Sequence, residues 1–203
     1  MKKIYILPNM VTTANMFCGF LSVVYTMDGE FLQAAIAILG AIFFDALDGR
    51  IARMARATSS FGVEYDSLSD LVSFGIAPAL LIYVMALKPY GRLGWLAAFL
   101  FMVCGALRLA RFNVTTEKLP KGFFLGLPIP GAAGTIAAFV IFFENSAVLL
   151  SQNIFQVVML ILSLGLSSLM VSTIYFPSFK EVNWRSKAAF GLWMTIMMTV
   201  ILI

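Results

Sequence analysis

The stretch FLQAAIAILGAIFFDALDGRIAR, residues 31–53, is an apolar run that ends among two aspartates, Asp45 and Asp48. A second stretch, GVEYDSLSD, carries Asp66 and Asp70 into the next apolar run. On helices, residues three or four apart lie on one face, about one turn from each other. Each pair of acids therefore shares a helix face, and two converging faces would bring four carboxylates into one small volume.

These acids predict a metal site. Carboxylate oxygens without His or Cys form the ligand set that hard divalent cations such as Mg²⁺ or Mn²⁺ prefer. The residues expected to hold metal are Asp45, Asp48, Asp66 and Asp70. A purely structural alternative is neutralisation by the neighbouring cations Arg50, Arg53 and Arg56. That alternative leaves the nearby Gly and Ala residues unexplained, since small residues keep a helix face open to another helix or to a flat ligand.

The surroundings of the acids predict an integral membrane protein. The chain of 203 residues is 61% hydrophobic and 12% charged, with a mean hydropathy of +0.95, which is far from a soluble composition. Each segment that crosses lipid must satisfy its own backbone hydrogen bonds, so we expect an all-α fold in one domain, residues 1–203. The predicted spans are 11–27, 31–55, 62–86, 94–112, 130–150, 153–175 and 187–203.

The distribution of basic residues predicts the orientation. With the amino terminus inside, all of the 14 Lys and Arg except Lys88 and Arg92 fall on the inner side. Basic loops stay in the cytoplasm, so we expect the amino terminus and both pairs of aspartates at the cytoplasmic face of the cell membrane. The net charge of +4 suits an anionic inner leaflet and phosphate-bearing substrates better than nucleic acid.

The spacing of the motif resembles a known signature. The pattern D-x-x-D-G-x-x-A-R, followed after residues 54–61 by G-x-x-x-D-x-x-x-D, is similar to that of the CDP-alcohol phosphatidyltransferase family. The residues that fill the signature are Asp45, Asp48, Gly49, Ala52, Arg53, Gly62, Asp66 and Asp70. The resemblance implies a membrane enzyme in which an alcohol displaces CMP from a CDP-linked lipid. It also implies a six-helix core with one or two further spans, and a homodimer.

The resemblance further implies roles for the four acids. Asp45, Asp48 and Asp66 would hold two metal ions, Mg²⁺ or Mn²⁺, which offset the charge of the pyrophosphate. Asp70 would be the general base, also near the metals, and would take the proton of the incoming hydroxyl. A carboxylate is a weak base for an alcohol, so a nearby metal ion must also acidify the nucleophile.

The remaining signature residues would bind the CDP-lipid. Arg53 would hold the pyrophosphate, and the small residues would line the cytidine pocket. The residues expected in this group are Gly49, Ala52, Arg53, Gly62, Asn15 and Thr12. For Thr12 and Asn15, which lie one turn apart in the first apolar run, a helix cap with a packing stripe is the alternative.

Segments outside the signature indicate the acceptor. The sequences LPNMVTTANMFCG, RLARFN, FLGLPIPGA and YFPSFK look like the phosphatidylserine synthase branch of this family. We therefore expect transfer of the phosphatidyl group from CDP-diacylglycerol, or of its counterpart from CDP-archaeol, to the hydroxyl of L-serine. Arg108 and Arg111 are the candidates for a pocket that holds the serine carboxylate or a phosphate, with a snorkelling helix end as the alternative.

Two other functions stay open at this point. The same chemistry with glycerol 3-phosphate or an inositol phosphate would bring an extra phosphate, for which a basic cluster denser than two arginines is expected. From a different class, a divalent-cation transporter would use intramembrane acids as its ion pathway. Transport predicts acids spread through the membrane depth, whereas the aspartates of this chain gather at one surface.

Overall fold

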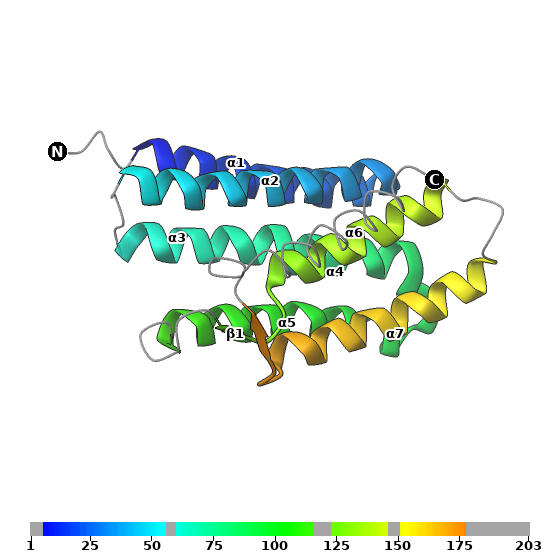
Figure 1. Ribbon diagram of the computed structural model, residues 1–203. Coiled ribbons are helices and arrows are strands. Elements are labelled where there is room, and N and C mark those ends of the chain that lie inside the picture. Colours follow the sequence, from blue (N-terminus) through cyan, green and yellow to red (C-terminus); the bar gives the residue numbers. More distant parts are fainter. Residues whose placement is uncertain (1–5, 56–59, 116–122, 146–150, 178–203) are drawn as a thin grey trace.

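The protein is a bundle of long helices that run roughly along one direction (Figure 1). The computed structural model describes residues 6–55, 60–115, 123–145 and 151–177. Its first two helices, α1 (Ile6–Met27) and α2 (Phe31–Ala55), are antiparallel and lie side by side. The chain reverses between them at Gly29, which has a φ of 80°. Glycine adopts this positive φ without strain because it has no Cβ atom.

The third crossing of the bundle is a composite helix. Its segments are α3 (Ser60–Asp70), η1 (Leu71–Ile76), α4 (Ala77–Ile82), η2 (Tyr83–Leu87) and η3 (Lys88–Tyr90). Pro78 has no amide hydrogen, so it cannot donate to the carbonyl one turn earlier. The amide of the preceding residue, Ala77, donates to the Val72 carbonyl, which lies five residues back instead of four. This wider π-helical turn begins directly after Asp70.

The second half of the chain closes the bundle. The helices are α5 (Arg92–Thr115), α6 (Ile129–Asn145) and α7 (Gln152–Val171). α5 packs against α7, and α6 packs against α2. A short strand before α6, β1 (Phe123–Leu125), pairs antiparallel with β2 (Tyr175–Pro177), which follows α7.

Small residues are frequent in the core of α2 and α6. Buried alanines on the two helices are Ala34, Ala35, Ala41, Ala132, Ala133, Ala137 and Ala138. Small side chains let helix backbones approach closely, which is the usual means of packing in a membrane because lipid offers no hydrophobic driving force between helices. Phe74, Phe101 and Phe155 fill the wider spaces toward the other helices.

The predicted all-α membrane fold is confirmed. The helices that are long and apolar enough to cross a membrane are Asn9–Met27, Phe31–Ile51, Ser60–Tyr90, Arg92–Val114 and Gln152–Val171. They correspond to the predicted spans 11–27, 31–55, 62–86, 94–112 and 153–175, except that α7 ends at Val171 and Tyr175 begins a strand. The predicted span 130–150 corresponds to the shorter helix α6, and positions 146–150 lie outside the described residues, as does the predicted span 187–203.

Candidate active site

Three of the four aspartates form one cluster. Asp45 and Asp48 come from α2 and Asp66 comes from α3, and each offers a carboxylate oxygen that lies within 4.8 Å of the other two. The spacing of three along α2 puts its two acids on one face, and α3 brings the third to meet them. The sequence prediction that the two motif halves converge is thus met by these three residues.

The cluster has the chemistry of a divalent-cation site. Within the described part of the chain, Asp48 Oδ2 and Asp66 Oδ1 are buried and have no hydrogen-bond partner. A buried carboxylate oxygen without a partner is costly, and three carboxylates in one place repel one another unless a cation lies between them. The orphaned oxygens therefore fit a hard cation with oxygen ligands.

Asp70 lies beside this cluster, one turn along α3 from Asp66. Its side chain is 8% exposed, it lies against Asp45, and its Oδ1 accepts a hydrogen bond of 3.1 Å from Asn15 Nδ2. The Asn15 side chain is fully buried on α1. The contact fixes the orientation of the Asp70 carboxylate from a helix that supplies none of the clustered acids.

The residues Thr12, Asn15, Gly19, Ser69 and Ser73 form what we call the α1–α3 seam. Ser69 Oγ donates to the Thr12 carbonyl and Ser73 Oγ donates to the Asn15 carbonyl, both at 3.0 Å. A Cβ atom on Gly19 would come within 2.6 Å of the Ser73 Cα, so the backbones touch here. The seam therefore holds α1 against α3 and η1 in a fixed register, and with it the Asn15 side chain.

Two further CDP-lipid candidates lie next to the cluster. The Thr12 hydroxyl and the Gly49 amide are within hydrogen-bonding reach of the Asp48 carboxylate. Gly62 lies in the first turns of α3 and is partly exposed. Ala52 and Arg53 continue the backbone of α2, but their side chains lie outside the described residues.

The two arginines predicted for the acceptor pocket lie in different environments. Arg108 of α5 is 9% exposed and interacts electrostatically with Asp70 and Asp45, and its Nε has no hydrogen-bond partner among the described residues. Arg111 instead donates from Nη1 to the Val171 carbonyl at 2.9 Å. From Nη2 it donates to the carbonyls of residues 170 and 172, at 3.2 and 3.1 Å. Arg108 therefore lies within electrostatic reach of Asp70 and Asp45, while Arg111 caps the carboxyl end of α7.

Sequence reasoning missed the two seam serines and the role of Gly126. Ser69 and Ser73, four residues apart in an apolar run, share a helix face, and that spacing was the available signal. Gly126 has a φ of 74°, and a Cβ atom there would come within 2.8 Å of Arg111 Nη2. Its amide donates to the Ile174 carbonyl at 3.0 Å, which docks the segment before α6 on the end of α7.

Comparison with known proteins agrees with this geometry. The family model described as CDP-alcohol phosphatidyltransferase matches residues 5–169. The CDP-diacylglycerol–serine O-phosphatidyltransferase of Helicobacter pylori is 38% identical over 184 residues, which is 91% of this chain and 77% of the relative. The enzyme of the same name from Bacillus subtilis is 38% identical, with 86% of this chain and 92% of the relative covered.

An archaeal relative extends the match beyond bacteria. The archaetidylserine synthase of Methanothermobacter thermautotrophicus is 39% identical over 176 residues, which is 84% of this chain and 69% of the relative. The acid cluster, the seam, Arg108 and Arg111 all lie within residues 5–169, which the family model matches. The chain belongs to the CDP-alcohol phosphatidyltransferase family.

Proposed function

We propose that this membrane enzyme transfers the phosphatidyl or archaetidyl group of a CDP-linked lipid to L-serine and releases CMP. The observation that carries the proposal is that the buried cation Arg108 lies within electrostatic reach of Asp70 and of Asp45, one of the three clustered acids. A serine substrate needs a base for its hydroxyl and a cation for its carboxylate. The names of the bacterial and archaeal relatives support the same acceptor.

Asp45, Asp48 and Asp66 would hold the metal, for which we propose two ions of Mg²⁺ or Mn²⁺. Bound divalent cations would supply the positive charge that offsets the pyrophosphate and the developing charge on the attacking and leaving oxygens. The Thr12 hydroxyl and the Gly49 amide are within hydrogen-bonding reach of the Asp48 carboxylate and would hold it in place. Asp70, which lies against Asp45, would contribute a further ligand.

Asp70 is the proposed general base. The serine hydroxyl oxygen forms a bond to the phosphorus that carries the lipid, the phosphoanhydride bond to CMP breaks, and the hydroxyl proton passes to Asp70. The hydrogen bond from Asn15 Nδ2 holds the Asp70 carboxylate while this happens. Because the carboxylate is already held in one orientation, little conformational entropy is lost when it accepts the proton.

Arg108 is the better candidate for the serine carboxylate. Its buried Nε offers an N–H group, and a charge-assisted bond to a carboxylate would satisfy it. Arg111 already donates to backbone carbonyls of α7, so the described cations near the acids do not make a dense cluster. This arrangement favours a carboxylate acceptor over one with an additional phosphate.

The CDP-lipid would lie across the same end of the bundle. Gly49, Ala52 and Gly62 leave room for the cytidine, Arg53 would hold the pyrophosphate, and Thr12 and Asn15 would border the site. We propose that this end lies at the cytoplasmic face of the cell membrane with the amino terminus on the same side, and the distribution of the basic residues supports this orientation. We also propose one catalytic domain, residues 1–203, that acts as a homodimer.

CMP release by the purified protein in detergent tests this function. CDP-diacylglycerol and CDP-archaeol are supplied with Mg²⁺ or Mn²⁺, and L-serine is compared with glycerol 3-phosphate and an inositol phosphate. We expect release that requires both serine and the metal ion. Release with a phosphorylated acceptor alone would overturn the choice of serine, and release without any divalent cation would overturn the metal site.

A further inference from the structure

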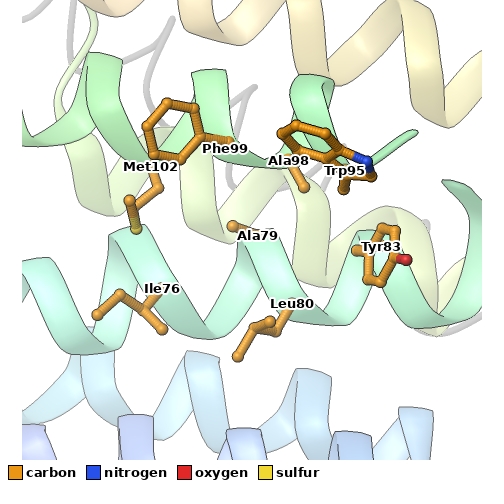
Figure 2. A pocket seen from close by; sticks show the side chains of 8 residues that line it. All are labelled: Ile76, Ala79, Leu80, Tyr83, Trp95, Ala98, Phe99 and Met102. Atoms are coloured by element: carbon orange, nitrogen blue, oxygen red, sulfur yellow. The ribbon is translucent and has the colours of Figure 1, made fainter. Parts of the chain in front are cut away.

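An apolar groove lies between the third crossing and α5 (Figure 2), and none of the four aspartates lines it. Its volume is about 310 Å³, which is in the range of small-ligand sites. Ala79 and Ala98 are buried and form its floor, and Trp95 and Phe99, 49% and 54% exposed, stand beside it as walls. The shape follows from the sequence, because alanines on facing helices leave a hollow between larger neighbours.

The groove has an apolar end and an end with polar atoms. In Figure 2 Ile76 and Met102 lie at one end, and Tyr83 and Trp95 lie at the other. Tyr and Trp collect at membrane interfaces because their rings are apolar and their O–H and N–H groups prefer water. Trp95 and Met102 are seven residues apart on α5, so the groove runs about 10 Å along the helix.

This groove belongs to the half of the bundle opposite the acids. The third crossing begins at Ser60 near the acid cluster and ends at Tyr90, and α5 begins at Arg92 and returns to bring Arg108 to the cluster. The turn that joins them lies at the far end of the bundle (Figure 1). A ligand in the groove would therefore lie in the other leaflet from the reacting CDP-lipid.

Two cations stand at the polar end of the groove. Arg92 and Trp95 are three residues apart on α5 and so share a helix face, and Lys88 lies in the same turn, with both cations exposed. At the same end Asp28 and Glu30 lie in the connection between α1 and α2, and Glu144 lies in the last turn of α6. The polar end of the groove thus lies close in sequence to two exposed cations, Lys88 and Arg92, which do not themselves line it.

We infer that this groove binds one acyl chain of an anionic phospholipid of the leaflet opposite the active site, with its phosphate at Lys88 and Arg92. An open apolar groove on a membrane helix faces acyl chains, which fill it without exposing polar atoms. The cations select the headgroup, because a Lys or Arg near the surface attracts anionic lipid. This site is separate from the one that binds the reacting CDP-lipid.

Fluorescence of Trp95 tests this site. Trp184 and Trp193, outside the described residues, are replaced by Phe, so that Trp95 is the remaining tryptophan. The full chain is reconstituted in phosphatidylcholine vesicles that contain phosphatidylglycerol, and either lipid carries bromine on its acyl chains. We expect brominated phosphatidylglycerol to quench Trp95 more strongly than brominated phosphatidylcholine at equal mole fraction, with a preference of up to about fivefold for each cation.

Two variants locate the effect. Lys88→Gln with Arg92→Gln should bring the lipid preference at Trp95 close to one, with CMP release unchanged. In a matched control, Trp95→Phe is combined with Leu93→Trp, which moves the probe to an exposed position at similar depth on α5, two residues away and so on another helix face. That probe should show less preference than Trp95.

Three results would overturn the inference. Equal quenching of Trp95 by the two brominated lipids would mean that the groove does not select an anionic headgroup. Weak quenching by both would mean that protein, such as a second copy of this chain, covers the groove. A preference that survives the loss of both Lys88 and Arg92 would mean that these cations do not hold the phosphate.

Discussion

The α1–α3 seam and the contact between α2 and α6 pack helices by opposite means. At the seam, serine hydroxyls donate to main-chain carbonyls of α1 and Asn15 donates to Asp70. At the α2–α6 contact both helices carry buried alanines, and a Cβ atom on Gly134 would lie 3.1 Å from Ile42 Cδ1. Apolar packing tolerates small shifts, whereas hydrogen bonds fix a register. The rigid contact is the one that orients the proposed base.

The largest effect on activity is expected from the loss of Asp66, an acid next to the seam. Asp66→Asn should lower CMP release by about a thousandfold or more, since the metal ions supply several kcal/mol of charge stabilisation. Calorimetric titration with Mn²⁺ should show weaker binding in the same variant. Glu64→Gln, an exposed change on the same helix, is the control and should leave both unchanged. Full activity of Asp66→Asn would remove the residue from the metal site.

The next effect separates proton transfer from metal binding. Asp70→Asn keeps the size of the side chain and should lower turnover by about a hundredfold to ten-thousandfold, the usual contribution of a general base. Binding of the CDP-lipid should stay measurable, as followed by equilibrium binding of labelled substrate. If binding is lost together with turnover, Asp70 is chiefly a metal ligand.

A smaller effect is expected from the residue that orients the base. Asn15→Ala removes the hydrogen bond to Asp70 and should lower kcat by about tenfold to a hundredfold, the usual value of a bond to a charged group. The affinity for Mn²⁺ should fall less than in Asp66→Asn, because Asn15 contacts Asp70 and none of the three clustered acids. Thr13→Val, which loses the 2.9 Å contact with the Tyr65 hydroxyl, is the neighbouring control and should stay active.

The smallest effects are expected on stability, when one glycine in each of the two contacts is replaced by alanine. Gly19→Ala places a Cβ atom against the Ser73 backbone and should destabilise the protein by about 1–3 kcal/mol. Gly134→Ala meets only the end of the flexible Ile42 side chain and should cost less than about 1 kcal/mol. Thermal unfolding in detergent measures both, and CMP release should fall in Gly19→Ala alone. Equal destabilisation by the two variants would erase the distinction between the contacts.

The sequence predicted the acids well because their spacing carries the information. Residues three or four apart on a helix share a face whatever the rest of the chain does, so Asp45 and Asp48 were predictable as a pair. The meeting of the two pairs depended on tertiary packing, in which α2 and α3 both lie against α1. Long apolar runs likewise predicted the spans, because a single segment that crosses lipid satisfies its backbone hydrogen bonds as a helix.

The sequence could not separate Arg108 from Arg111. The two residues are three apart, and periodicity puts them on one face, but that face is wide enough for one to meet the acids and the other to meet α7. The outcome depends on where α7 ends, which is a property of the tertiary structure. The π-helical turn after Asp70 also escaped prediction, because Pro78 indicates a break without saying how the chain relieves it.

The seam has a consequence for the biogenesis of the protein. A nascent chain emerges amino terminus first, so α1 and α2 can pair at the Gly29 turn before α3 arrives. Entry of an acid into lipid alone is energetically costly, and Asp70 finds a hydrogen-bond partner in Asn15 on the first of the paired helices. The α1–α2 hairpin thus lowers the free-energy cost of inserting the third crossing. Assembly of the site is then part of the folding of the membrane domain.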